Sequence, residues 1–369
     1  MKDNFEILFQ PVNIGAVEIK NRIVMAPMVT NYCETDGSVT ERLTSFLEAR
    51  AKGGAGLIIV EAAYVHPSGR GMSHQVGIHK DEMIGGLKTL VDRIHRHGAK
   101  VAVQLFHCGR QGSSSLTGSP LMAPSGVPCP VCQEVPQEMT LDDIQMIVDA
   151  FGHAAVRAKK AGFDLIEIHG AHGYLVNQFL SPYSNKRKDD YGGSFENRTR
   201  FPLMILSRIR KAVGDDYPVC YRMSSDEYVD GGLTIEDTAI FSRMLVEQGI
   251  HAIDVSGGVY ESKKMVVQSP DMAHGIFADN ASAIKKSIKA AVPVIVAGNI
   301  KDPYMAKTIL DDGKADMIAL GRALLADPDF PNKIETGRAE EINSCTGCNQ
   351  GCIDRLFEGH DISCVMNPE

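Results

Sequence analysis

Short apolar runs alternate with amphipathic stretches along most of this chain of 369 residues. Each run is predominantly apolar, as expected of a strand that is buried on both faces. Each stretch that follows repeats its apolar positions at helical spacing. The pattern predicts strands at 22–25, 56–60, 99–105, 164–168, 219–223, 252–255, 293–297 and 317–320, and helices at 40–52, 81–97, 140–160, 197–213, 234–248, 281–289 and 306–312.

Strict alternation of strands and helices is typical of a parallel sheet whose faces are covered by helices. Eight such units predict an α/β protein that closes into a (β/α)₈ TIM barrel, with a short hairpin at 7–20 ahead of the first strand. No G-x-G-x-x-G opens a helix after a strand, which argues against a Rossmann domain within these residues. The loop at 109–136 is rich in Pro, Ser and Gly, and its length predicts a functional or lid loop. We expect the barrel over 1–338 and a separate short segment over 339–369.

Composition narrows the class of partner. The net charge of −8 argues against nucleic acid or an anionic membrane as the main partner. No apolar run reaches the about 18–20 residues needed to span a bilayer, and the N-terminus lacks the apolar region of a secretory signal. Nine cysteines in such a chain do not suggest a disulfide framework. We expect a cytoplasmic protein that acts on a small molecule, and leave homo-oligomer formation open.

In a barrel of this type, chemistry is located where the strands end. The strand at 164–168 is followed at once by His169, His172 and Tyr174. One interpretation is a zinc site, to which Glu61 or His107 would add the third protein ligand. The other is a pair of donors that polarise a carbonyl oxygen, with Tyr174 as a proton donor.

Other strand ends carry residues suited to a phosphorylated cofactor. Glycine permits close approach of the backbone to a phosphate, and arginine adds charge-assisted hydrogen bonds. A glutamine and an arginine on two further strands suit the polar edge of a flavin ring, although the arginine could instead pair with a carboxylate at the barrel rim and the glutamine could bond a loop backbone. The residues are Gly298 and Asn299 after the seventh strand, Gly321 and Arg322 after the eighth, Gln104 after the third and Arg222 after the fifth.

Four cysteines crowd the end of the chain in the pattern C-x₂-C-x₃-C-x₁₁-C. Zinc ribbons use two separated C-x₂-C pairs, whereas three close cysteines with a distant fourth resemble iron–sulfur ligation. We therefore expect Cys345, Cys348, Cys352 and Cys364 to bind a metal centre. A further C-x₂-C, formed by Cys129 and Cys132, has no partner pair and is interpreted as loop chemistry.

The stretch HGAHGYLVNQFLSPYSNKRKDDYGGSFENR resembles the signature of Old Yellow Enzyme-type flavin oxidoreductases. The terminal cysteines narrow the resemblance to the branch of 2,4-dienoyl-CoA reductase, enoate reductases, trimethylamine dehydrogenase and clostridial bile-acid flavin oxidoreductases. The similarity extends from LFQPVNIGAVEIKNRIVMAPM to the last cysteine.

The resemblance implies an FMN-binding barrel over 1–338 and a 4Fe–4S-binding segment over 339–369. The four cysteines would hold the cluster, His169 and His172 the carbonyl oxygen of the substrate, and Tyr174 would donate the proton. The FMN contacts implied are Pro27, Met28, Val29, Ala62, Gln104 and Arg222, with the phosphate against Gly298, Asn299, Gly321 and Arg322.

Three departures from the family pattern bear on these expectations. Relatives in this branch usually continue with domains for FAD and NAD(P)H, so we expect either a truncated chain or an unusual stand-alone form. Glu261 or Ser262 falls where dienoyl-CoA reductase has a histidine that assists protonation. Val29, where relatives often carry Cys or Thr, cannot bond the flavin O4, although Thr30 is adjacent.

The resemblance implies an ene-reductase that depends on NADH or NADPH in the full-length protein and acts on CH–CH groups. Its substrate would be an enoate, an enone or an enoyl-CoA, with flavonoids and steroid enones also open. The alternative is an oxidative amine or alcohol dehydrogenase of the trimethylamine dehydrogenase type. A metal or electron-carrier module without enzymatic activity is the third possibility.

Overall fold

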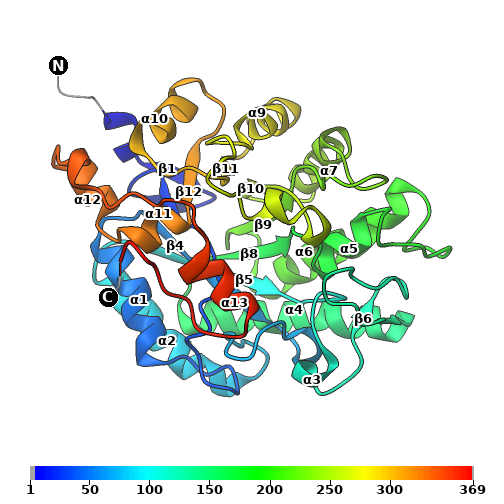
Figure 1. Cartoon of the computed structure of the whole chain (residues 1–369). Coiled ribbons are helices and arrows are strands. Elements are labelled where there is room, and N and C mark those ends of the chain that lie inside the picture. Colours follow the sequence, from blue (N-terminus) through cyan, green and yellow to red (C-terminus); the bar gives the residue numbers. More distant parts are fainter. Residues whose placement is uncertain (1–4, 368–369) are drawn as a thin grey trace.

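Eight parallel strands close into a barrel in the computed structural model, which describes residues 5–367. The first strand pairs with both the second and the last, so the sheet has no free edge. The predicted (β/α)₈ fold is confirmed (Figure 1). The strands are β3 (Ile23–Met25), β4 (Leu57–Tyr64), β5 (Lys100–Phe106), β8 (Leu165–Gly170), β9 (Val219–Ser224), β10 (Ala252–Ser256), β11 (Val294–Val296) and β12 (Met317–Leu320).

An outer ring of helices covers the barrel (Figure 1). Two of them begin with a capping box, in which Thr140 pairs with Asp143 and Thr234 with Asp237, so the helix starts are fixed by the sequence. The predicted helices all form, with ends shifted by a few residues. They are α1 (Glu41–Lys52), α2 (Ile84–His95), α4 (Leu141–Ala161), α6 (Phe195–Val213), α7 (Ile235–Glu247), α9 (Ala278–Ser287) and α10 (Pro303–Asp311), and after β12 come α11 (Arg322–Ala326) and α12 (Phe330–Glu335).

The barrel interior is closed at its N-terminal end. The hairpin of β1 (Val12–Ile14) and β2 (Val17–Ile19) forms where 7–20 predicts it. Its buried Ile14 and Ile19 pack against the inward-facing side chains of the strands. Because apolar side chains fill this end of the barrel, the space for a ligand lies at the other end, where the C-terminal ends of the strands meet.

Two segments near those strand ends differ from the prediction. A short helix, α5 (Leu175–Leu180), follows β8 directly, and all six of its residues are buried. Asn177 and Gln178 interrupt its apolar pattern, and for that reason the sequence does not reveal it. The expected loop at 109–136 contains α3 (Ser114–Thr117) and β6 (Met122–Ala123), and β6 pairs in parallel with β7 (Gln137–Glu138).

The C-terminal segment lies across the mouth of the barrel (Figure 1). It contains a π-helical turn at Gln350–Asp354 and α13 (Arg355–Phe357). The Ile362 carbonyl accepts a hydrogen bond from the Tyr32 hydroxyl at 2.8 Å, and the Ile362 N–H donates to the Thr30 carbonyl at 3.0 Å. No helix within residues 5–367 is both long and apolar enough to cross a membrane.

Candidate active site

One cavity at the C-terminal ends of the strands contains all of the barrel residues predicted to act in catalysis or in cofactor binding. Its space amounts to about 1350 Å³, including the part open to solvent. The C-terminal segment contributes one wall, through Ile353, Leu356 and Phe357. The predicted residues that line it are Pro27, Met28, Val29, Ala62, Gln104, His169, His172, Tyr174, Arg222, Gly298, Asn299, Gly321 and Arg322.

The end of β8 brings three rings together. The ring centroids of His169 and His172 lie 5.2 Å apart, and those of His169 and Tyr174 lie 4.9 Å apart. His172 has a φ of 60°, a left-handed conformation that is uncommon for a residue with a side chain. It is held there because its N–H donates to the Ser224 hydroxyl at 2.8 Å. This turn directs both imidazoles to the same cavity.

Both histidines are neutral. Burial lowers the pKa of His169 and of His172 well below the usual value, and the positive charge of Arg222 lowers both further. The Nδ1 atom of His169 accepts the Ala171 N–H at 3.3 Å, so its proton resides on Nε2. The Nε2 atom of His172 lies 2.8 Å from the Ser256 hydroxyl. Ser256, which had no signal in the sequence, is therefore the hydrogen-bond partner of the His172 ring.

Tyr174 has a partner that the sequence did not reveal. Its hydroxyl lies 3.0 Å from the hydroxyl of Tyr260, in the loop after β10. Burial raises the pKa of Tyr174 to about 12, and the hydrogen bond from Tyr260 opposes this rise. Tyr260 directly precedes Glu261 and Ser262, the residues that fall where dienoyl-CoA reductase has a histidine.

The residues assigned to the flavin ring belong to a buried polar group inside the barrel. Gln104 Nε2 donates to Glu167 Oε1 at 2.7 Å, and Arg222 Nε lies 3.4 Å from Asp254 Oδ2. Burial, followed by the neighbouring charge of Asp254, raises the pKa of Glu167. Arg222 therefore forms the ion pair considered from the sequence, and yet Arg222 and Gln104 both also line the cavity.

The strand ends at β11 and β12 carry the residues predicted to cradle a phosphate. Gly298 has a φ of 121°, and a Cβ there would lie 2.6 Å from the buried Phe277 ring, so this position requires glycine. Asn299 has a φ of 53° and is fixed by hydrogen bonds to the Met272 and Ala273 carbonyls. Arg322 lies beside it.

Lys301 was missed in the sequence. It is only 8% exposed, lines the same cavity and forms no ion pair with any other residue in 5–367. The cavity thus has three cations, Arg222, Lys301 and Arg322, and no carboxylate lines it. This charge suits an anionic ligand, and the glycine-walled cradle beside two of the cations fits the phosphate of FMN.

The zinc interpretation of His169 and His172 is not supported. Over the described part of the chain, no group of three or more His, Cys, Asp or Glu side chains could hold a metal ion. Glu61 accepts two hydrogen bonds from Thr30, and His107 Nε2 lies 3.1 Å from the Ser68 hydroxyl. Both proposed third ligands are therefore occupied elsewhere.

The four C-terminal cysteines share a second, smaller cavity of about 290 Å³. They do not form a site for a single ion. All four thiols are free and partly exposed, and the Gly347 N–H donates to the Cys345 sulfur at 3.4 Å. Arg322 lines this cavity as well as the larger one, and its Nη1 donates to Asn349 Oδ1 at 2.7 Å.

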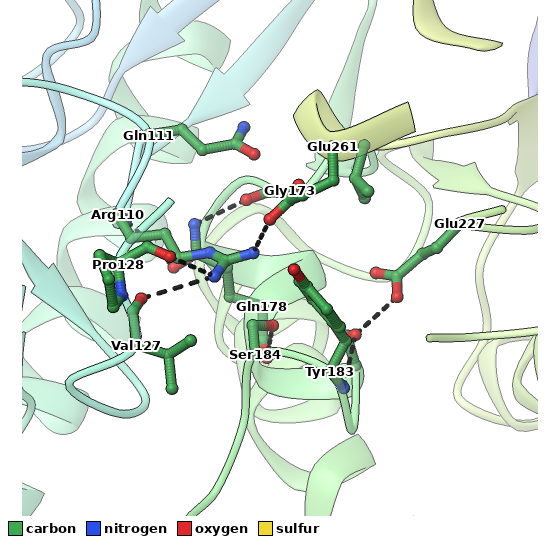
Figure 2. Close-up of polar contacts among 12 residues, drawn as sticks. Arg110, Gln111, Val127, Pro128, Gly173, Gln178, Tyr183, Ser184, Glu227 and Glu261 are labelled. Atoms are coloured by element: carbon green, nitrogen blue, oxygen red, sulfur yellow. Dashed lines mark hydrogen bonds and ion pairs between the residues drawn. The ribbon is translucent and has the colours of Figure 1, made fainter. Parts of the chain in front are cut away.

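Beside the mouth of the larger cavity, a buried ion pair joins two loops. Arg110 donates to Glu261 at 2.6 Å, and their side chains are 2% and 9% exposed. Arg110 also donates to the Pro128 carbonyl at 3.1 Å and to the Val127 carbonyl at 3.5 Å (Figure 2). The pair links the loop after β5 to the loop that carries Tyr260.

The cations of this cavity and its neutral donors suit a flavin-dependent oxidoreductase. The family is settled by comparison of the sequence: residues 7–341 match the model of the NADH:flavin oxidoreductase / NADH oxidase family, and the chain belongs to this family of FMN enzymes.

Curated relatives agree with this assignment. An NADH oxidase of Thermoanaerobacter brockii is 45% identical over 99% of this chain and 56% of its own length. A cinnamate reductase of Clostridium sporogenes is 36% identical over 100% of this chain and 58% of its own length. The chain therefore spans little more than half the length of these relatives.

Solved structures resemble the whole chain. A complex of 2-naphthoyl-CoA reductase with 2-naphthoyl-CoA superposes with a TM-score of 0.95 at 33% identity, covering 99% of this chain and 57% of the other. Histamine dehydrogenase from Rhizobium sp. 4-9 superposes with a TM-score of 0.88 at 30% identity, covering 99% and 52%. The structures similar to this chain thus include one named as a reductase and one named as a dehydrogenase.

Proposed function

We propose that this chain is the catalytic barrel of an ene-reductase that reduces a C=C bond activated by a carbonyl group. Bound FMN would supply the hydride to the β-carbon. His169 and His172 would donate hydrogen bonds to the carbonyl oxygen, where negative charge develops, and Tyr174 would donate its proton to the α-carbon. The substrate class is an enoate, an enone or an enoyl-CoA.

The observation that carries the proposal is the convergence of neutral donors and a phenol on one wall of the cavity. The neutral imidazole of His169, with its proton on Nε2, donates a hydrogen bond without placing a full positive charge beside the substrate. Tyr174 stays protonated up to a pKa of about 12, so it holds a proton at every physiological pH. Such a wall suits a substrate that becomes an enolate and then takes up one proton.

The FMN would be held by residues of the same cavity. Arg222 and Gln104 would face the polar edge of its ring, with Pro27, Met28, Val29 and Ala62 against the rest of the ring. Gly298, Asn299, Gly321 and Arg322 would hold the phosphate. Lys301 adds a positive charge for the FMN phosphate, because it has no ion-pair partner among residues 5–367.

We also propose that Cys345, Cys348, Cys352 and Cys364 hold a 4Fe–4S cluster that passes electrons to FMN. All four line one cavity, and their C-x₂-C-x₃-C-x₁₁-C spacing resembles iron–sulfur ligation. Gly347 donates a hydrogen bond to the Cys345 sulfur, as is common around such clusters. Electrons from NADH or NADPH would arrive through FAD, in a region beyond these residues.

The donors that follow β8 favour reduction over the oxidative alternative. The three cations of the cavity are assigned to FMN, so they do not select between an amine and a carbonyl substrate. Aromatic faces, including Phe106 and Phe357, line the cavity and could attract a cationic amine. His169, His172 and Tyr174 instead suit the oxygen of a carbonyl group, and for that reason we favour the unsaturated carbonyl.

The test is anaerobic turnover of the reconstituted holoenzyme with a panel of α,β-unsaturated acids, ketones and CoA esters, beside a panel of amines. We expect alkene reduction, and loss of it in Tyr174→Phe with the flavin content unchanged. Tyr191→Phe is the matched control, because its hydroxyl contacts Met204 outside the cavity. Turnover of amines alone, or full alkene reduction by Tyr174→Phe, would contradict the proposal. A purified protein without flavin absorption would exclude both enzymes.

A further inference from the structure

A run of aromatic rings leads from the histidines to the mouth of the cavity. The centroid of the Phe106 ring lies 5.8 Å from that of His169 and 4.6 Å from that of Tyr174. The Tyr260 ring follows at 5.8 Å from Tyr174, and the Phe357 ring lies 5.6 Å from Tyr260. All of these rings line the cavity. Because the proposed chemistry uses neither Phe106 nor Phe357, these two rings are left without a role.

Phe357 is the outermost ring of this run. It belongs to α13 in the C-terminal segment, which lies across the mouth of the barrel (Figure 1). Phe357 is 39% exposed, whereas Phe106 and Tyr260 are buried. A ligand that covered the exposed part of this ring would remove apolar surface from water, which is favourable. If the carbonyl group of that ligand lay at the histidines, a tail pointing out of the barrel would reach Phe357 last.

The angles between the rings suit an aromatic partner. From Phe106 to Phe357, neighbouring rings are inclined to each other by 75°, 74° and 66°, which is the edge-to-face arrangement. Aromatic rings prefer this arrangement because the edge of a ring is positive and its face is negative. A substrate ring placed against Tyr260 and Phe357 would continue the same pattern. A saturated ring of similar size would cover the same apolar surface but lacks this distribution of charge.

The charges around the run favour an uncharged aromatic group over a cationic one. Among residues 5–367, the charged side chains that line the cavity are Arg222, Lys301 and Arg322, which are assigned to FMN. The Lys263 ammonium lies 4.6 Å from the centroid of the Phe357 ring, so a cation already lies against this ring. A cationic substituent at the same place would be repelled by Lys263, whereas an uncharged arene would not.

We propose, on the basis of the ene-reductase activity proposed above, that the unsaturated carbonyl substrate carries an aromatic ring and that Phe357 selects it. The carbonyl oxygen would lie at His169 and His172, with the C=C bond beside Tyr174. The aromatic substituent would then lie against Tyr260 and Phe357. Loss of one aromatic pair should lower the second-order rate constant for such a substrate by about 2- to 12-fold, the equivalent of about 0.5–1.5 kcal/mol.

The experiment compares benzylideneacetone with its analogue that has a cyclohexyl ring in place of the phenyl ring. The reconstituted holoenzyme is reduced chemically and mixed anaerobically with each ketone, and reoxidation of its flavin is followed by absorbance. Phe357→Leu keeps an apolar side chain and removes the ring. We expect it to lower the second-order rate constant for the phenyl ketone by about 2- to 12-fold and for the cyclohexyl ketone by less than about 2-fold. Comparing each ketone between the two proteins cancels the different intrinsic reactivities of the alkenes.

Two further variants separate a specific role from a structural one. Phe357→Tyr keeps the aromatic ring and should retain the rate constant for the phenyl ketone. Phe195→Leu is the matched control, because Phe195 begins α6 outside the cavity and also has a cation over its ring, with Arg198 at 5.7 Å. It should change neither rate constant. Flavin content is measured in every variant.

Other outcomes overturn the proposal. Equal losses for both ketones in Phe357→Leu would show that the residue acts through the structure of the mouth, and no loss for either would show that its ring does not reach the substrate. Both results would leave the ene-reductase activity standing, because both ketones are still reduced by the natural chain. If the natural chain reduces neither ketone, the proposed function fails. Titration of the oxidised holoenzyme, followed by flavin absorbance, then decides whether Phe357→Leu weakens binding of the phenyl ketone alone.

Discussion

Tyr260→Phe tests whether the hydroxyl behind Tyr174 matters for proton donation. The substitution removes one oxygen, 3.0 Å from the Tyr174 hydroxyl, and keeps a ring in place against Phe357. A hydrogen bond between neutral groups is worth about 0.5–1.5 kcal/mol. At about 1.36 kcal/mol for each factor of ten, the proton transfer should slow by about 2- to 12-fold. Tyr174→Phe removes the acid itself and should cost about 10²–10⁴-fold.

The double variant gives the decisive comparison. If Tyr260 acts through Tyr174, Tyr174→Phe together with Tyr260→Phe should be no slower than Tyr174→Phe alone. The assay is a single turnover, in which the reduced enzyme is mixed with an unsaturated ketone and reoxidation of the flavin is followed by its absorbance. Flavin content is measured in every variant, so a general loss of structure would be recognised.

Two results would refute this reasoning. Penalties that multiply in the double variant would mean that Tyr260 works independently of Tyr174. A loss in Tyr260→Phe as large as in Tyr174→Phe would mean that Tyr260 is the proton donor. The pH profile adds a check. The pKa of Tyr174 is about 12, and the hydrogen bond from Tyr260 lowers it, so loss of that bond would raise it further. Neither the natural protein nor Tyr260→Phe should therefore lose activity through ionisation of Tyr174 between about pH 6 and 9.

Three further predictions concern cofactor binding and stability. Arg322→Ala should weaken FMN binding by about 10- to 150-fold, the equivalent of about 1.5–3 kcal/mol for charged hydrogen bonds, as measured by fluorescence titration of the flavin-free protein. Burial raises the pKa of Glu61 from 4.5 to about 7, so the folded protein binds the proton more tightly and stability falls as pH rises through that window. The melting temperature of Glu61→Gln minus that of the natural chain should therefore be larger at pH 8 than at pH 5. The same difference at both pH values would contradict this prediction. Gly170→Ala should lower the melting temperature, because its Cβ would lie 2.1 Å from the buried Tyr221 ring, whereas Gly85→Ala in α2, with nothing within 4 Å, should raise stability by up to about 1 kcal/mol.

The barrel was predictable because its strands are buried on both faces, and that leaves an apolar run in the sequence. The end of each run marks the place where side chains reach the cavity. For that reason Gln104, Arg222 and the residues of the cradle could be placed at the cavity without a structure. A residue that reaches the cavity because it lies at the end of a strand can therefore be predicted from the sequence around it.

Contacts between loops were not predictable. Tyr260 is distant from Tyr174 in the chain, and its hydroxyl reaches Tyr174 because Arg110 holds the adjacent Glu261. Lys301 carried no local signal either, since a lysine after a glycine-rich turn is usually exposed. Its burial depends on the C-terminal segment, where a Cβ on Gly347 would lie 3.4 Å from its ammonium nitrogen. Such placements depend on how separate segments pack, which periodicity does not encode.

Arg322 lines both the large cavity and the cysteine cavity. If FMN and the cluster bind as proposed, this shared residue would make their binding free energies depend on each other, because the centre that binds first would fix the guanidinium for the second. Linkage would make the effect reciprocal: the factor by which the cluster tightens FMN would equal the factor by which FMN tightens the cluster. In a cell short of iron, this protein would then bind flavin less tightly. In a cell short of flavin, it would bind fewer clusters.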